Sequence, residues 1–273
     1  MCGIMGFSFK SGKLSSARKA ILAANLAYQN DQRGGHSWGV VGLNGGKAFI
    51  NRGMGDLMDN AHALCDYDTL FAHTRWASCG EKTIENAHPF RIGNILGAHN
   101  GKIYNHLELD KKYGRKFPVD SQHIFAHLNE NRSFDDMEGY GAIEWIRRND
   151  PNTIYLSKLL DGELAIYGIG DINNTDGIVW SSNFQHALKS LAAAGITEFF
   201  RYEVRKGTVF MINDGDIHIQ TGIKLELSKY EPPPVPEIEW PYHKVDDFRT
   251  FRKMYMDFEN KKNESLIKQS QLS

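Results

Sequence analysis

The residue best suited to chemistry stands at the start of the chain. Cys2 follows Met1, so removal of the methionine would leave one residue that carries both a thiol and a free α-amine. An α-amine titrates at about pH 8, and its neutral form can take the proton of the thiol directly or through one water. This pattern predicts that Cys2 is a nucleophile that carries its own base. On position alone, a small buried apolar residue in a first strand is the commoner interpretation.

A second candidate group is the pair Asn100-Gly101. Nucleophilic attack on a carbonyl builds negative charge on its oxygen, and donors fixed at that oxygen stabilise the charge. The side-chain amide of Asn100 and the backbone N–H of Gly101 are two such donors, and a glycine permits close approach of the backbone. An isolated Asn-Gly pair is more often a simple turn, so its role depends on the segments around it.

These segments resemble the class II glutamine amidotransferases, most closely the glutaminase domain of glucosamine-6-phosphate synthase. The opening Met1-Cys2-Gly3-Ile4-Met5-Gly6 is similar to the start of that family, and further matches follow in the family's order. They read RGGHSWG at 33–39, HTRWASCG at 73–80, NAHPF at 86–90, AHNGKIYNH at 98–106 and VDSQH at 119–123. Weaker likeness continues at 160–165, 181–183, 187–188 and 205–208. The resemblance is strongest over residues 2–123.

The resemblance implies a fold and a reaction. The fold is α+β, a four-layer αββα sandwich of two mainly antiparallel sheets between helices, of the N-terminal-nucleophile hydrolase type. The reaction is hydrolysis of L-glutamine to L-glutamate and ammonia through a γ-glutamyl thioester on Cys2. Asn100 and Gly101 would stabilise the oxyanion, and Arg33 would brace the N-terminal site. The ordinary alternative for Arg33 is a solvated loop charge.

The ends of the substrate suggest further residues. Free glutamine carries a carboxylate and an ammonium, so a selective pocket needs a planar cationic fork and an anion. Arg75 and Asp120 suit these ends, although a surface ion pair is the commoner fate of such residues. Trp76 would close over the substrate, with core packing as its alternative. Ser78 and His88 would complete the hydrogen bonding around the α-carbon groups.

Three positions depart from the family pattern. His36 stands where the family's loop usually has aspartate, so hydrogen bonds made by that carboxylate need another source. Gln122 stands where relatives often place glutamate, and Cys79 where they place histidine. None of these changes removes a core catalytic group. We therefore expect them to affect loop geometry more than the nucleophile.

Hydrophobic spacing and turn residues predict many strands and few helices. The turn Asn44-Gly45-Gly46 predicts a hairpin, and Asp120 or Ser121 suits the start of a helix. The predicted strands cover 3–9, 38–43, 47–52, 69–74, 92–99, 164–169, 177–180, 199–204, 208–213 and 216–220, and the predicted helices cover 15–30, 121–129, 142–148 and 185–194.

The composition excludes several classes of function. Lysine plus arginine, 32 residues, nearly equals aspartate plus glutamate, 33, so no whole-chain field attracts nucleic acid or an acidic membrane. No apolar run approaches the length of a membrane span. Three cysteines are too few for a disulfide framework, which favours a cytoplasmic protein. His62, Cys65, His73 and Cys79 lack the spacing of zinc sites, so we expect no metal and no cofactor.

Clustered prolines at 232–236 predict the end of the globular domain. We expect a glutaminase domain over 1–230 and a Pro-rich linker with a charged, partly helical tail over 231–273. No acceptor module is recognisable after residue 230, so the expected partner is a separate synthase subunit that receives ammonia. A homo-oligomer is compatible with the sequence.

Two rival functions remain at the level of sequence. The first is an N-terminal-nucleophile amidase that acts on another amide, for which the altered loop at His36 would be the clue. The second is a catalytically silent subunit that senses glutamine or regulates a partner. The pair Arg75 and Asp120 disfavours the first rival. The complete set of Cys2, Asn100, Gly101 and these two residues disfavours the second.

Overall fold

The computed structural model describes residues 2–64 and 67–230, and the predicted linker and tail at 231–273 lie outside the described residues. The strands are β1 Gly3–Phe9, β2 Ser37–Asn44, β3 Lys47–Met54, β4 Thr69–Arg75, β5 Phe90–Ile92, β6 Ile95–Ile103, β7 Gly139–Arg147, β8 Asp150–Lys158, β9 Ala165–Asp171, β10 Asn174–Ser181, β11 Phe199–Arg201, β12 Thr208–Asn213 and β13 Asp216–Lys224. The helices are α1 Ser16–Asp31, the 3-10 helix η1 Met58–Leu64, α2 His106–Tyr113, α3 Gln122–Glu130 and α4 Phe184–Ala193.

The described strands form two sheets. A seven-stranded sheet has the order β11-β9-β10-β1-β4-β2-β3, and a six-stranded sheet has the order β13-β12-β8-β7-β6-β5. Every pair of neighbouring strands in both sheets is antiparallel. The first strand, β1, lies in the interior of its sheet between β10 and β4. The start of the chain is therefore held on both sides.

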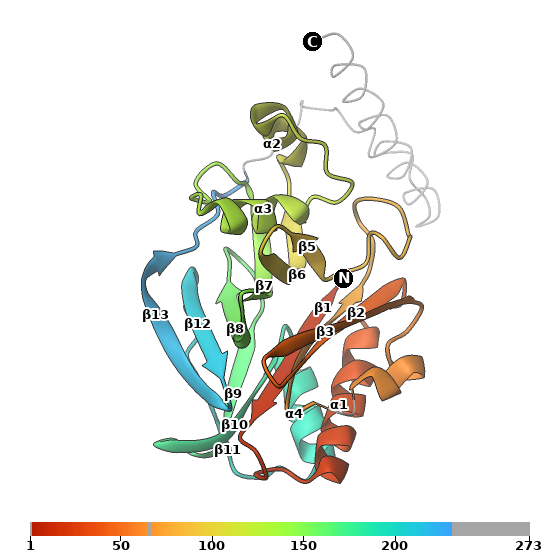
Figure 1. Cartoon of the computed structure of the whole chain (residues 1–273), viewed down its shortest axis with the longest axis vertical. Coiled ribbons are helices and arrows are strands. Elements are labelled where there is room, and N and C mark those ends of the chain that lie inside the picture. The colour runs from red at the N-terminus through yellow and green to blue at the C-terminus, as the bar shows by residue number, and fades with distance from the viewer. Residues whose placement is uncertain (1, 65–66, 231–273) are drawn as a thin grey trace, which may run out of the picture. The chain divides into compact units, whose positions relative to one another are not determined.

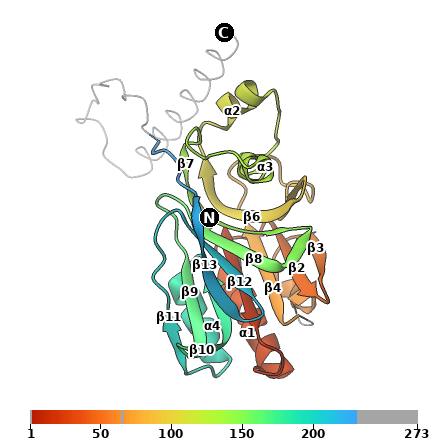
Figure 2. The same cartoon turned by 60° about the vertical axis from the view of Figure 1, so that its left-hand side comes forward.

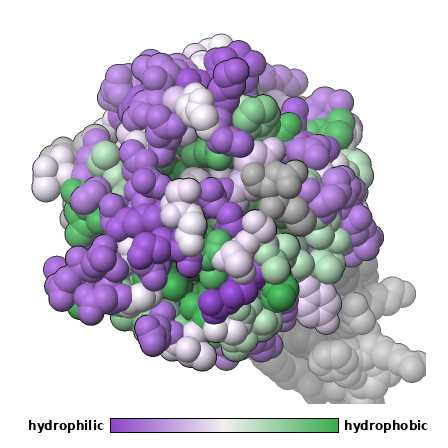
Figure 3. Space-filling view, turned by 60° about the horizontal axis from the view of Figure 1, so that its bottom comes forward, coloured by the Kyte–Doolittle hydropathy of each residue, from purple (hydrophilic) through white to green (hydrophobic). Residues whose placement is uncertain are grey.

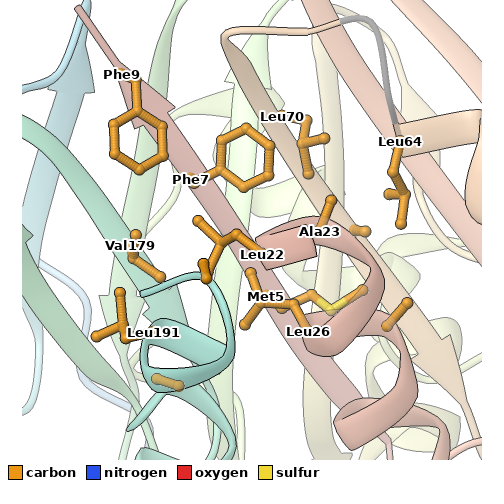
Figure 4. Packing of buried hydrophobic residues seen from close by; sticks show 14 of the residues in the cluster. Met5, Phe7, Phe9, Leu22, Ala23, Leu26, Leu64, Leu70, Val179 and Leu191 are labelled. Atoms are coloured by element: carbon orange, nitrogen blue, oxygen red, sulfur yellow. The ribbon is translucent and has the colours of Figure 1, made fainter. Parts of the chain in front are cut away.

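Alternation along β1 explains the first two layers. Met5, Phe7 and Phe9 face α1 and α4, because successive side chains of a strand point to opposite faces. Figure 4 shows this cluster, in which Leu22 and Leu26 of α1 lie beside the strand. The spacing of four residues places both leucines on one face of the helix. Burial of this face fixes α1 against the sheet.

The other face of the seven-stranded sheet packs on the six-stranded sheet. Ile4 and Phe71 share a buried cluster with Leu96 and Ile154 of the second sheet. A third cluster joins the outer face of the second sheet to α2 and α3, for example through Phe125. In Figures 1 and 2, α1 and α4 lie at one end of the stack and α2 and α3 at the other. The predicted four-layer αββα sandwich is confirmed.

Four elements differ from the sequence prediction. The predicted helix at 142–148 is wrong, because residues 142–147 lie in β7, which pairs with β6 and β8. The strand β8, the helix α2 and the 3-10 helix η1 had no predicted counterpart. Ser121 is the residue before α3, as predicted, but its side chain makes no capping hydrogen bond. It bonds to His99 Nδ1 instead, at 2.9 Å.

The surface over the helical layer is mixed. On the face shown in Figure 3, hydrophilic and apolar residues are interspersed. Ile21 and Tyr28 of α1 are 44% and 53% exposed. The helix therefore buries one side and leaves the other in contact with solvent. Among the described residues, none of the helices has the length and apolar character needed to cross a membrane.

Candidate active site

Cys2 directly precedes β1, and its sulfur lies against the backbone that leaves β4. The N–H of Trp76 donates to Cys2 Sγ at 3.3 Å, and the thiol donates to Trp76 O at 3.5 Å. The residue is half-buried and lines a pocket. Cys2 is therefore not the fully buried apolar residue that its position alone would suggest. The paired strands hold the sulfur in place while the pocket leaves one side of it open.

Arg33 reaches the same corner from the loop after α1. Its Nε donates to Cys2 O at 3.1 Å, and its Nη1 donates to Glu163 Oε2 at 2.9 Å. The arginine side chain is only 12% exposed, whereas that of Glu163 is 63% exposed. Arg33 therefore ties the backbone of Cys2 to the segment before β9.

Asn100 and Gly101 lie inside β6, so they form no turn. Gly101 stands opposite Gly141 of β7. The N–H of Gly141 donates to Leu160 O at 3.2 Å, and its C=O accepts from Leu159 N at 2.8 Å. Because residues of an antiparallel pair either exchange both ladder bonds or neither, the Gly101 N–H points away from β7. It is not used by this ladder.

The position of Gly101 also requires the absence of a side chain. A Cβ atom there would lie 2.0 Å from Tyr140 O and 2.6 Å from Gly141 Cα. Within the described residues, the side-chain amide of Asn100 makes no hydrogen bond. Both residues line the pocket that Cys2 lines. The sulfur and two hydrogen-bond donors therefore face one space.

That pocket has a volume of about 330 Å³. Six of the predicted site residues line it, namely Cys2, Arg33, Trp76, Ser78, Asn100 and Gly101. Four further lining residues were not predicted as site residues, namely Tyr140, Asp161, Gly162 and Glu163. The last three belong to a segment with weaker family likeness, which was the one sequence signal for them. Tyr140 lies in no segment that resembles the family, so the sequence did not indicate it.

The loop that follows β4 forms one wall of the pocket, and Arg75 holds it. Arg75 is buried, and its Nη1 and Nη2 donate to Glu81 O at 3.1 Å and Cys79 O at 2.7 Å. The guanidinium therefore does not line the pocket in this structure. Trp76 is 51% exposed and does not pack in the core. Its ring stacks on His36, with centroids 4.2 Å apart.

Asp120 is buried beside this wall. Its Oδ2 accepts from the N–H of Ile103 at 2.7 Å. Ile103 follows Gly101 by two residues in β6, so both N–H groups point to the same side of the strand. Arg75 and Asp120 both act electrostatically on the Cys2 thiol, and with opposite signs. The structure thus brings both predicted recognition residues close to the sulfur, although neither lines the pocket.

His88 is buried away from the lining of the pocket. Its ring packs at a tilt between those of His73 and Phe90, with centroid distances of 4.0 Å and 4.4 Å. Neither ring nitrogen has a hydrogen-bond partner among the described residues. Burial lowers the pKa of His88 well below its usual value and that of His73 to about 3. His88 does not line the pocket, and both rings are neutral at physiological pH.

Burial raises the pKa of the Cys2 thiol, against the smaller opposing effects of the Trp76 N–H and the Arg75 guanidinium. The thiol is therefore protonated at neutral pH unless a base removes its proton. The two hydrogen-bond contacts of the sulfur among the described residues are both with the Trp76 backbone. A side-chain base is not in contact with it in this part of the chain.

The three departures from the family pattern have local partners. His36 Nδ1 accepts from the N–H of Ala77 at 2.9 Å, so an imidazole supplies the acceptor that a carboxylate would otherwise offer. Gln122 Oε1 accepts from Val119 N at 3.1 Å at the start of α3. Cys79 Sγ lies 3.9 Å from His106 Nε2, which raises the pKa of His106.

The described residues contain no group of three or more His, Cys, Asp or Glu side chains that could hold a metal ion. Cys65, one of the cysteines considered for zinc, lies outside the described residues. His73 and Cys79 do not share a cluster with His62 in the part of the chain that is described.

Comparison with known proteins gives relatives in both sequence and fold, although no family model matches the chain. Glutamine-fructose-6-phosphate aminotransferase (isomerizing) of Aquifex aeolicus is 32% identical over 195 residues, which are 64% of this chain and 32% of the relative. The Vibrio vulnificus protein of the same name is 27% identical over 242 residues, which are 80% of this chain and 36% of the relative. This chain therefore spans about a third of the length of these relatives.

A solved structure of glutamine phosphoribosylpyrophosphate amidotransferase from B. subtilis shares the fold, with a TM-score of 0.57 and 19% identity. The match covers 81% of this chain and 50% of that one. Similarity in sequence to glutamine-dependent aminotransferases, together with the fold of a glutamine amidotransferase, confirms the resemblance to the class II glutamine amidotransferases that the motifs indicated.

Proposed function

We propose that the chain is the glutaminase part of a glutamine amidotransferase and hydrolyses L-glutamine to L-glutamate and ammonia. One observation carries this proposal. The sulfur of Cys2 borders a pocket of about 330 Å³ together with the amide of Asn100 and with Gly101. A nucleophile and two donors around one space are what hydrolysis of an amide through a covalent intermediate requires.

In the first half of the reaction, the neutral α-amine of Cys2 takes the thiol proton. The thiolate attacks the side-chain carbonyl carbon of glutamine, and the oxygen that becomes negative accepts hydrogen bonds from Asn100 and Gly101. The amide nitrogen then takes the proton from the α-ammonium and leaves as ammonia. A γ-glutamyl thioester on Cys2 remains.

In the second half, water attacks the thioester carbonyl and gives one proton to the α-amine. The tetrahedral intermediate collapses to glutamate and the thiolate, which takes the proton back. This use of the α-amine is supported by the surroundings of the thiol, because burial raises its pKa and the described contacts of the sulfur are with the Trp76 backbone. The mechanism requires that Met1 is removed.

For substrate recognition, we propose that Arg75 serves the carboxylate of glutamine and Asp120 its ammonium. Arg75 uses two of its roughly five N–H donors on the carbonyls of Cys79 and Glu81, so donors remain for an anion. Ser78 lines the pocket and Trp76 stands exposed at its wall, where it is able to cover a bound substrate. His88 acts behind the pocket, through the packing of its ring against His73.

The test is covalent labelling with the glutamine analogue 6-diazo-5-oxo-norleucine, followed by intact mass measurement and peptide mapping. We expect one label per chain on an N-terminal peptide that begins at Cys2 and lacks Met1. The variant Cys2→Ala should stay unlabelled and lose at least about 10³-fold in ammonia release. Peptide mapping separates Cys2 from Cys65 and Cys79, which serve as internal controls.

The rival functions give other results in the same experiment. A silent subunit takes up no label. An amidase for a different amide has a reactive Cys2 but releases no ammonia from glutamine. Retention of Met1 on the native protein, or ammonia release that persists in Cys2→Ala, contradicts the mechanism.

We also propose that the ammonia passes to a separate synthase partner. The support is the name that the sequence relatives carry, glutamine-fructose-6-phosphate aminotransferase, which denotes transfer of an amino group from glutamine to a sugar phosphate. We expect a synthase that co-purifies with this chain from the native cells to form its aminated product from glutamine only when this chain is present. If the synthase forms as much of that product from glutamine without this chain, the proposal is wrong.

A further inference from the structure

His36 lies between α1 and β2, and its contacts reach the segment that follows β4. Its backbone N–H donates to Arg75 O at 3.0 Å, and its C=O accepts from Gly55 N at 3.1 Å. Its Nδ1 accepts from Ala77 N at 2.9 Å. Its ring stacks on Trp76 at 4.2 Å, with 24° between the planes. One side chain thus holds two successive residues of the pocket wall.

One of these two residues, Trp76, contacts the sulfur directly, and the other, Ala77, follows it in the chain. Trp76 contacts Cys2 Sγ through both its N–H and its C=O. Ala77 lies between Trp76 and Ser78, which both line the pocket. A shift of the Ala77 peptide would therefore move the wall and the sulfur contacts together.

We propose that His36 is a positioning residue of the glutamine site, which holds the segment 76–78 through its Nδ1 acceptor and its ring. The expected change in KM rests on the proposed glutaminase function. The expected effect of His36 on the position of Ala77 does not, because the contact between the two residues exists whether or not glutamine is the substrate.

The proposal predicts a dependence on pH. Nδ1 accepts a hydrogen bond only in the neutral ring, since the imidazolium carries a proton on both nitrogens. Burial lowers the pKa of His36 from its ordinary 6.5, and so do Lys82, Arg75 and the amino end of the chain. The ring is therefore neutral at pH 7. As the pH falls through the His36 pKa, the acceptor is lost and an N–H faces the Ala77 N–H.

Two variants separate the acceptor from the ring. His36→Asn keeps an oxygen acceptor near the Nδ1 position but does not titrate. His36→Phe keeps a flat ring for Trp76 but has no acceptor. We expect His36→Phe to raise KM for glutamine about tenfold at pH 7.5, the effect of one lost hydrogen bond, with a smaller change in kcat. His36→Asn should stay within about threefold of the parent and lose the rise of KM in acid. His218→Phe on β13, an exposed position, is the matched control.

A second measurement does not depend on activity. Trp76-Ala77 is the single Trp-Ala pair in the sequence. Labelling with ¹³C-carbonyl tryptophan and ¹⁵N-alanine therefore yields one assigned amide signal in NMR spectra. We expect the Ala77 signal to shift with pH in step with the His36 ring, and to lose this titration in His36→Asn.

The outcomes separate the two proposals. If Cys2 is not labelled and no ammonia forms while Ala77 still titrates with His36, the proposed function fails and the positioning role stands. If Ala77 does not respond to His36, or if His36→Phe and the His218→Phe control have the same KM in an active enzyme, the positioning role is wrong.

Discussion

The proposed oxyanion donors, Asn100 and Gly101, can be tested at the scale of a single residue. Asn100 presents its amide to the pocket without a partner among the described residues, so it has no other bonding role there. We expect Asn100→Ala to lower kcat for glutamine hydrolysis by about 10²- to 10³-fold, with a small change in KM, because the donor acts mainly in the transition state. Steady-state ammonia release measures both constants.

Asn173→Ala, in the exposed turn between β9 and β10, serves as the matched control. It should keep parental kcat and KM. If Asn100→Ala raises KM while kcat stays unchanged, Asn100 contributes to ground-state binding, which contradicts the oxyanion role.

Most residues that line the pocket could be named from the sequence, for a physical reason. The nucleophile and the oxyanion donors that we propose, Cys2 and Asn100-Gly101, lie in short fixed motifs whose chemistry limits the residue type. Tyr140 escaped because a pocket wall can use any flat side chain, so its type carries no information. The bonds of Arg75 to the Cys79 and Glu81 carbonyls also could not be predicted, since they depend on how the loop folds back.

At the scale of elements, the prediction was right where a strand has one apolar face or follows a clear turn. It was wrong for the helix predicted at 142–148, because residues 142–147 lie in β7. Ala142 faces the other sheet while Ile143 and Trp145 face the helices, so both sides of the strand are buried. Such a run has no alternation, and its apolar positions also match helical spacing. Pairing with β6 and β8 makes this segment a strand.

The contact of β2 with the loop before β5 gives a prediction about an element. A Cβ atom on Gly39 would lie 1.9 Å from His88 O. This is a backbone atom, so no side-chain rotation relieves the clash, and β2 or the loop has to move. We expect Gly39→Ala to lower the free energy of unfolding by about 1–3 kcal/mol and the Tm by several degrees. Thermal unfolding followed by circular dichroism measures the change.

Gly12→Ala provides the contrast for this experiment. It has a φ of +76° but nothing within 4 Å of the added Cβ. It tests backbone strain without a clash and should cost about 1 kcal/mol. Equal Tm values for Gly39→Ala and the parent would show that β2 and the loop separate without cost, which contradicts the close packing.

At the scale of the whole molecule, the layered architecture followed from the family resemblance. Periodicity alone gave strands and helices but not their stacking order. The structure adds a polar contact inside the layer between the two sheets. Glu144 of β7 is fully buried there, and its Oε2 accepts from Trp180 Nε1 of β10 at 2.8 Å. Its Oε1 has no partner among the described residues. This contact joins the sheets at a cost in desolvation.

The buried carboxyl predicts how stability depends on pH. Burial raises the pKa of Glu144 well above 4.5, so the folded protein keeps it protonated, whereas the unfolded chain loses the proton above about pH 4.3. The folded state then binds more protons, and its stability falls as pH rises above that value, by up to about 1.4 kcal/mol per pH unit for this group.

Glu144→Gln keeps an acceptor for Trp180 but does not titrate. We expect its advantage over the parent in urea unfolding to grow as the pH rises above about 5, until the pH reaches the raised pKa of Glu144, whereas Glu198→Gln, at an exposed position, should show no such trend. Parallel stability curves for parent and Glu144→Gln would mean that the carboxyl ionises inside the sandwich, and that water or a movement of the sheets reaches the layer between them.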